Sequence, residues 1–236
     1  MTGDAQGSRH AERGVPSRAW RETAAAGPVT LLENMKPKIV IIDYGMGNLR
    51  SVQKAFEVSG VNPKVTSSRF DIGKADKIIL PGVGAFSQAM HELKKNGLIE
   101  VLKDKICSGT PYLGLCLGLQ ILFSSSEEGS AKGLGLLPGK VKKFNGNEKV
   151  PHMGWNTLSL KKRNCPLMKG VSKKDFFYFV HSFYAVPEDK NTILSTTDYG
   201  INFCSSIWQD NIFATQFHPE KSQQAGLRII GNFIAC

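Results

Sequence analysis

Short apolar runs alternate with amphipathic segments through the first half of this chain, and this alternation restricts the fold more than any other feature. The apolar runs have the length of buried strands, and the segments between them carry apolar residues at helical spacing. A repeated strand–helix order requires a parallel sheet with helices on both faces. We predict strands at 38–43, 61–66, 76–80 and 110–115, and helices at 48–59, 85–96, 98–108 and directly after Cys116.

The chain after Gly129 is richer in strand-like runs, which are joined by short turns such as 209–211. These strands are predicted at 141–144, 155–160, 176–181, 192–196, 204–209 and 212–216, before a closing helix at 223–235. The predicted fold class is therefore α/β, with a mostly parallel sheet flanked by helices and a β-rich C-terminal half.

Length and composition favour one folded domain. With 236 residues, 41% of them hydrophobic, the chain can build one α/β core but hardly two. Residues 1–34 mix arginines with acids and show no apolar period, so we expect a disordered N-terminal extension, with the natural start at Met35 and the domain at 35–236. Neither a transmembrane run nor the apolar segment of a secretory signal is found, which predicts no membrane association.

The cysteines and the net charge indicate which kinds of protein the chain does not resemble. The 5 cysteines are an odd number, lie far apart and form no C-x-x-C pair, so we predict neither a disulfide framework nor a metal site. A reducing, cytoplasmic compartment fits best. The net charge of +10 comes from lysines in short dispersed groups, which favours a solvated basic surface, or a docking face for an acidic partner, over nucleic-acid binding.

One cysteine stands in a distinctive setting. In GLCLGLQ (114–120), Cys116 lies between two glycines, at the end of an apolar run and before a helix-like one. This is the pattern of a nucleophile at a strand-to-helix turn, where a helix N-terminus would favour the thiolate. A buried core cysteine is the alternative.

A thiol nucleophile needs a base, and QFHPEKS (216–222) offers one. His218 and Glu220 lie two positions apart after a predicted strand, so both side chains point to one side of an extended segment. Glu220 could then fix the imidazole tautomer while the other ring nitrogen faces the thiol. Alternatively, His218 ends a strand and Glu220 is a surface acid.

The third motif is PGVG (81–84), which closes a predicted strand. Ligands of open parallel sheets bind beyond the carboxyl ends of the strands, so this loop is expected near Cys116. Its backbone at Val83 and Gly84 could donate to an oxyanion, with the amide of Leu117 as a second donor. A common Pro-Gly turn would look the same, but the three motifs together supply nucleophile, base and oxyanion donors.

These motifs together resemble the class I (triad) glutamine amidotransferases, whose fold is flavodoxin-like. DYGMGNLRSV (43–52), HMGWN (152–156) and the EKS that follows 218–219 are similar to the glutaminase subunits of imidazole glycerol phosphate synthases. The resemblance covers 35–236. It implies that Cys116 attacks the amide of L-glutamine to form a glutamyl thioester, and that His218 protonates the leaving ammonia and then activates water. No cofactor is implied.

The same resemblance implies a partner. Ammonia would pass to a cyclase subunit, in a heterodimer, which makes imidazole glycerol phosphate and an aminoimidazole carboxamide ribonucleotide for histidine and purine synthesis. The residues that match partner-facing positions of the family are Met46, Asn48, Trp155, Tyr178 and Lys221. For Trp155 a core role is the alternative, because large aromatics serve cores and interfaces alike.

For substrate binding, the family pattern places Gln120 and Glu128 near the α-amino and α-carboxylate groups of glutamine. An ordinary solvent-facing helix residue is the alternative for Gln120, and Glu127 could be confused with Glu128. Backbone contacts are implied at Gly82, Gly84, Ser182 and Phe183. By the same pattern, His152 and His181 are interface or supporting residues and not bases.

Other functions stay open at this point: a related glutaminase that feeds another synthase, such as amino-sugar assembly; a non-catalytic scaffold; or a cysteine peptidase of related fold. The glycines around Val83 also suggest a peptide that can flip. We therefore expect low glutaminase activity in the free chain, with the oxyanion donor supplied only when partner and acceptor nucleotide bind.

Overall fold

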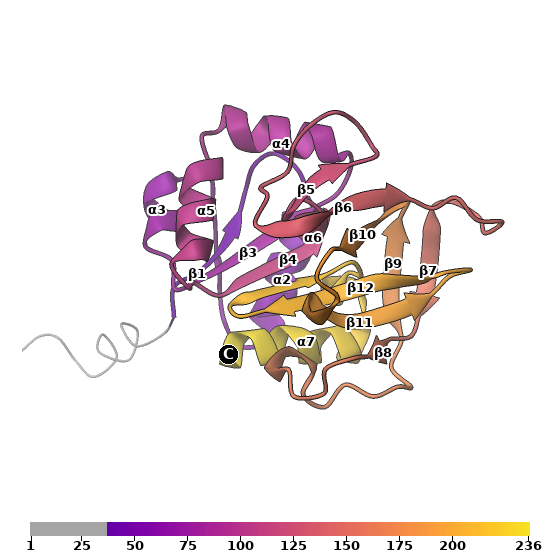
Figure 1. Ribbon diagram of the computed structural model, residues 1–236. Helices are drawn as coiled ribbons and strands as arrows, with labels where there is room; N and C mark the ends of the chain where they lie inside the picture. The colour runs from indigo at the N-terminus through magenta and orange to yellow at the C-terminus, as the bar shows by residue number, and fades with distance from the viewer. Residues whose placement is uncertain (1–36) are drawn as a thin grey trace, which may run out of the picture. The chain divides into compact units, whose positions relative to one another are not determined.

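A computed structural model describes residues 37–236, and Figure 1 shows its elements. The disorder expected for residues 1–34 lies outside the described part. The described chain forms one compact unit around an 11-stranded sheet, with a separate two-stranded ladder.

Parallel strands make up the half of the sheet that was predicted from the alternation. Neighbouring strands run in the order β2 (Lys64–Thr66), β1 (Ile39–Ile42), β3 (Lys77–Gly82), β4 (Tyr112–Cys116) and β13 (Ile212–Thr215). Every residue of β1, β3, β4 and β13 is buried, as expected of strands covered on both faces. The last strand of the chain therefore lies in the middle of the sheet.

Helices cover the two faces of this sheet and create two apolar clusters (Figure 1). On one face, α2 (Leu49–Val58) and α7 (Gln223–Ala235) contribute side chains such as Phe56 and Phe233. On the other, α3 (Arg69–Gly73), α4 (Phe86–Lys95) and α5 (Ile99–Cys107) contribute Ile72, Leu93 and Leu102. The predicted class, a mostly parallel sheet flanked by helices, is confirmed.

The β-rich half continues the sheet beyond β13 with mostly antiparallel pairs. The order is β12 (Asn202–Gln209), β10 (Phe183–Pro187), β6 (Leu137–Lys143) and β5 (Phe123–Ser126). A branch of β11 (Ile193–Asp198) and β8 (Ser159–Leu160) pairs with β12. The separate ladder joins β7 (His152–Asn156) to β9 (Phe177–His181).

Several local predictions were wrong. The helix after Cys116 is a single turn, α6 (Leu117–Gln120), and the apolar run that follows it enters β5. Periodicity could not separate the two, because a run that is buried all round fits helix and strand equally. The single strand predicted at 155–160 is divided between β7 and β8, and α3, β5 and β10 were not predicted.

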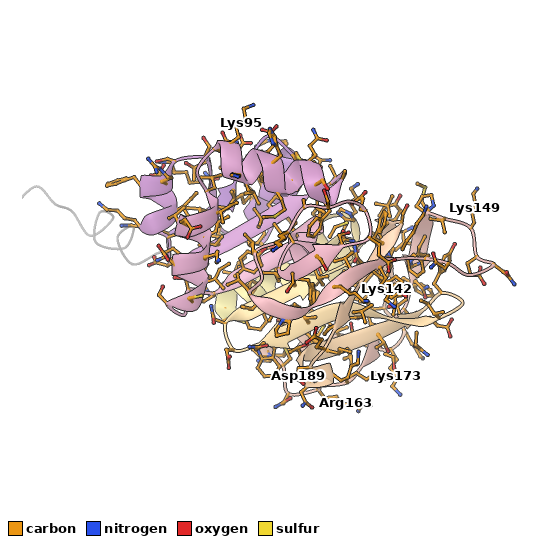
Figure 2. All side chains as sticks on the ribbon, turned by 45° about the horizontal axis from the view of Figure 1, so that its top comes forward. Lys95, Lys142, Lys149, Arg163, Lys173 and Asp189 are labelled. Atoms are coloured by element: carbon orange, nitrogen blue, oxygen red, sulfur yellow. The ribbon has the colours of Figure 1, made fainter. Side chains whose placement is uncertain are left out.

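The basic side chains are spread over separate elements. Figure 2 shows Lys95 on α4, Lys142 on β6, Lys149 in the loop after β6, and Arg163 and Lys173 in the segment between β8 and β9. This scatter agrees with a solvated basic surface. Among residues 37–236, none of the helices has the length and apolar character to cross a membrane.

Candidate active site

Cys116 is the last residue of β4, at the turn into α6. Its backbone φ of 53° lies in the left-handed region, which is unusual for a residue other than glycine. The parallel register sets Cys116 beside Gly82 at the end of β3. Because α6 is only four residues long, the helix supplies little of the electrostatic support that its predicted N-terminus implied.

The two glycines of GLCLGLQ are explained by the close approach of backbone segments around this turn. A Cβ on Gly118 would lie 1.9 Å from the carbonyl oxygen of Leu80 in β3, and a Cβ on Gly114 would lie 2.5 Å from that of Gly118. Real Cβ atoms do not approach other atoms below 3.0 Å. Only glycine therefore lets the nucleophile turn pack directly on β3.

The histidine predicted as the base follows the neighbouring strand. Strand β13 runs parallel to β4, and the chain after it carries His218 to the same edge of the sheet as Cys116. His218 Nδ1 lies 2.7 Å from Glu220 Oε1, and the two side chains are only 3% and 2% exposed. The Glu220 carboxylate is thus buried against the imidazole, and the alternative of a surface acid is wrong.

The backbone of His218 is held from both sides. Its N–H donates to the carbonyl of Tyr178 in β9 at 2.9 Å, while Ser222 Oγ donates to the carbonyl of His218 at 2.6 Å and accepts from the N–H of Tyr178 at 3.0 Å. The following 3₁₀ turn, Pro219–Lys221, packs tightly on α7, since a Cβ on Gly226 would lie 1.8 Å from the carbonyl oxygen of Pro219.

Electrostatics favour a charged imidazole. Burial lowers the pKa of His218, but the neighbouring Cys116 thiolate and the hydrogen bond and charge of Glu220 outweigh it and raise that pKa to about 10. Nε2 of His218 is buried and has no hydrogen-bond partner among residues 37–236, so it is the ring nitrogen left for chemistry. Burial and the charge of Cys116 raise the pKa of Tyr44, whose hydroxyl is also buried without a partner there.

A cavity of about 450 Å³ opens onto the sulfur, a size suited to a small ligand. Eight of the predicted site residues line it: Val83, Gly84, Cys116, Leu117, Gln120, Glu128, Ser182 and Phe183, with Ala85, Pro151, Val180 and His181. Gly82 lies next to this lining, against the side chain of Leu117. A larger cavity of about 770 Å³, between Ser159 and Lys174, contains none of the predicted residues.

The two polar residues predicted for substrate binding are both fixed by hydrogen bonds. Gln120 is 5% exposed and donates from Nε2 to the carbonyl of Phe183 at 2.9 Å, so the alternative of a solvent-facing helix residue is wrong. Glu128 accepts from the N–H of Phe86 at 2.7 Å and lines the cavity. Its neighbour Glu127 does not line the cavity and accepts from the N–H of Lys143.

The residues predicted to face a partner divide into two groups. Trp155 is 46% exposed and forms an edge contact with Tyr178 at a centroid distance of 5.8 Å, and Lys221 Nζ lies 5.7 Å from the Tyr178 ring. A core role for Trp155 is therefore wrong. Asn48 caps α2 through Ser51, and Met46 is partly buried next to Gly84.

Two contributors to the site were missed. Gln216 is fully buried and donates from Nε2 to Cys116 Sγ at 3.6 Å. The signal was present, because Gln216 lies two positions before His218 in an extended segment and so shares its side. Nothing in the sequence indicated that the Tyr44 hydroxyl lies against Gly82. His181, expected as an interface or supporting residue, lines the cavity.

No group of three or more His, Cys, Asp or Glu side chains within 37–236 is arranged to hold a metal ion. The cysteines are all free thiols, with Cys107 and Cys236 exposed and Cys165 and Cys204 buried.

Sequence comparisons identify the relatives of the chain. Residues 40–236 match the family described as glutamine amidotransferase class-I. The protein named imidazole glycerol phosphate synthase subunit HisH from Syntrophotalea carbinolica is 52% identical over 203 residues, which is 83% of this chain and 98% of that protein. The protein of the same name from Aquifex aeolicus is 50% identical over 198 residues, 83% of this chain and 95% of that protein.

Solved structures show the same fold at low identity. PurLQS from Thermotoga maritima superposes with a TM-score of 0.66 at 19% identity, over 85% of this chain and 98% of that one. The glutaminase domain of CTPS from Trypanosoma brucei gives a TM-score of 0.60 at 16% identity, over 84% of this chain and 91% of that one.

Proposed function

This chain belongs to the class-I glutamine amidotransferases, and we propose that it hydrolyses glutamine with Cys116 as nucleophile, His218 as base and Glu220 as the orienting carboxylate. The observation that carries the proposal is the buried His218–Glu220 pair at 2.7 Å, whose free Nε2 lies on the strand edge that presents Cys116. As a member of the HisH family, the chain is the glutaminase subunit of imidazole glycerol phosphate synthase.

The first step is attack by sulfur. With the pKa of His218 raised to about 10, its imidazole is charged and stabilises negative charge on the Cys116 sulfur, which is the nucleophilic form. The Cys116 sulfur attacks the side-chain amide carbon of glutamine, and the imidazolium gives its proton to the amide nitrogen as the C–N bond breaks. Ammonia leaves, and a glutamyl thioester remains on Cys116.

Water completes the reaction. Neutral His218 then takes a proton from a water molecule through Nε2 while Glu220 holds Nδ1–H, and the hydroxide attacks the thioester carbonyl. Glutamate is released and the thiolate is restored. In both steps the developing oxyanion would accept from backbone amides of Val83 or Gly84 and of Leu117, which all border the cavity.

Substrate binding uses the polar lining of the same cavity. We assign Glu128 to the α-ammonium group, because a carboxylate held by the Phe86 amide is a preorganised acceptor. Both hydrogen bonds of Gln120 use Nε2, which leaves its Oε1 as the acceptor it can offer the substrate. The remaining wall of the substrate cavity is shaped by backbone at Gly82, Gly84, Ser182 and Phe183.

The partner is the cyclase subunit, and we propose that it docks on the surface around Trp155. Met153, Trp155 and Phe176 are 62%, 46% and 54% exposed there, and exposed apolar side chains in a group mark interaction surfaces. Tyr178 connects this surface to the proposed base, since its backbone carbonyl accepts from the N–H of His218. Lys221, Met46 and Asn48 extend the proposed contact.

We further propose that residues 35–236 form the amidotransferase domain and that the protein is cytoplasmic. The family match over 40–236 supports the first proposal, and the free cysteines support the second. We also propose that the Val83 peptide is the gated oxyanion donor. Val83 is 40% exposed and precedes Gly84, whose φ of 95° gives the loop its freedom to turn.

The test is glutamate release from glutamine by the purified chain, with and without the cyclase and its nucleotide ligand. Activity should disappear in Cys116→Ala and should rise on addition of the liganded cyclase by about 10²–10³, the value of one oxyanion donor. Turnover by the isolated chain that the cyclase leaves unchanged would exclude gating. Turnover that survives Cys116→Ala would exclude the assigned nucleophile.

A further inference from the structure

A buried chain of hydrogen bonds ends at the nucleophile. Gln216 Nε2 lies 3.6 Å from Cys116 Sγ, and Gln216 Oε1 accepts from Gln120 Nε2 at 3.1 Å. Gln120 Nε2 also donates to the carbonyl of Phe183 at 2.9 Å. Both glutamines are almost fully buried, with 0% and 5% exposure, so water does not compete for these groups.

The direction of this chain is set by one backbone carbonyl. The Phe183 oxygen can only accept, so the group of Gln120 that faces it must be the amide nitrogen. The same nitrogen faces Gln216, which must therefore present its oxygen to Gln120 and its nitrogen to the sulfur. A flip of the Gln120 amide would set its oxygen against the Phe183 oxygen, and a flip of the Gln216 amide would set two nitrogens against each other.

A histidine pair holds the carbonyl in place. His181 Nδ1 lies 2.8 Å from the Phe183 oxygen, so Nδ1 carries the proton, and His181 Nε2 lies 3.0 Å from His152 Nδ1. Burial lowers the pKa of His181 to about 3 and that of His152 to about 4, so both rings are neutral at physiological pH. His181 Nε2 then accepts from His152, and the Phe183 oxygen accepts from both His181 and Gln120.

We infer that Gln216 is a positioning residue which donates a hydrogen bond to the Cys116 sulfur, with its orientation fixed through Gln120 by the Phe183 carbonyl. A donor at this point favours the thiolate, because a thiolate accepts hydrogen bonds far better than a thiol does. This inference deepens the proposed function, since it concerns the reactivity of the proposed nucleophile.

The experiment measures alkylation of Cys116 by iodoacetamide, without glutamine or cyclase, so it does not depend on turnover. Cys107 and Cys236 are exposed, so the modified peptide is followed by mass spectrometry. Gln216→Met keeps the length of the side chain but removes the donor, and Gln216→Glu replaces the donor with an acceptor. Gln209→Met, at the exposed far end of β12, is the matched control.

At neutral pH, we expect Gln216→Met to react about 10-fold more slowly than wild type and Gln216→Glu more slowly still, from the usual strength of hydrogen bonds to charged groups. At alkaline pH, where the thiol ionises without help, the rates should converge. The other titratable groups of the site are His218 with Glu220, Tyr44, and the cavity-lining Glu128 and His181, and these variants leave all of them in place. A merely structural role would slow the reaction equally at both pH values.

Gln120→Met tests the orientation. If Gln120 acts only through Gln216, the double variant should react no more slowly than Gln216→Met alone, whereas additive losses would overturn the route through Gln120. If a folded Gln216→Met protein is alkylated at Cys116 as fast as wild type at neutral pH, the proposed hydrogen bond from Gln216 is overturned. If that variant does not fold, as judged by thermal unfolding, Gln216→Glu and Gln120→Met decide the question by the same two-pH comparison. If Gln216→Met loses glutaminase activity but Cys116 is alkylated at the wild-type rate, this inference is refuted while the proposed function of the wild-type protein stands.

Discussion

The tight packing of the Cys116 turn on β3 can be tested with one methyl group. Gly118→Ala would place Cβ 1.9 Å from the carbonyl oxygen of Leu80, and to reach 3.0 Å the turn and β3 must separate by about 1.1 Å. That oxygen belongs to a buried strand and cannot rotate away. The overpacking should lower the free energy of unfolding by about 3 kcal/mol, the upper end for added methyl groups.

The same displacement moves the nucleophile. A misplacement of about 1 Å costs on the order of 100-fold in rate, so kcat/KM for glutamine with the liganded cyclase should fall by about that factor. Gly231→Ala is the matched control, because nothing lies within 4 Å of its added Cβ in the middle of α7, and it should stabilise by about 0.5–1 kcal/mol. Urea unfolding and steady-state kinetics give both quantities. A Gly118→Ala protein with wild-type stability and activity would refute the steric explanation of the motif.

Three further outcomes are expected. The imidazole of His218 should stay charged until the pH approaches about 10, and in Cys116→Ala its titration, followed by NMR, should move down because burial then opposes Glu220 alone; an unchanged titration would contradict the ion pair. The folded-state pKa of His152, about 4, lies below its unfolded value, so His152 costs no stability above about pH 6.5, and the free energy of unfolding should fall by about 2 kcal/mol on going to pH 5. His152→Phe should reduce this loss, measured by urea unfolding at each pH; an equal pH dependence in the two proteins would reject the explanation. Glu128→Gln keeps an acceptor for the Phe86 amide but removes the charge, so KM for glutamine should rise about 10-fold with little change in kcat, and an unaltered KM would remove Glu128 from the ammonium site.

The fold could be predicted from the sequence where a local pattern is compatible with only one kind of element. Buried runs such as 38–43 and 76–80 become parallel strands because no other arrangement covers both faces. The glycines around Cys116 likewise indicated a tight turn. The length of α6 was not predictable, because its end depends on pairing of β5 with β6, and that contact lies outside the local sequence.

The site was predictable in its reactive groups and less so in its supporting ones. Cys116, His218 and Glu220 have chemistry that stands out in any sequence. A buried glutamine does not, because its role depends on which atoms surround it. Gln216 and Cys116 are 100 residues apart and meet only because β13 enters the sheet next to β4.

The position of β13 has a consequence for the synthesis of the protein. A chain emerging from the ribosome presents Cys116 and its glycine turn long before β13 and the His218 that follows it. Strand β13 must then insert between β4 and β12, with parallel pairing on one side and antiparallel on the other. Such long-range pairing forms late in folding. If His218 is the base, as proposed, the nascent chain cannot release ammonia, and the thiol acquires its reactivity only when the C-terminal segment joins the centre of the sheet.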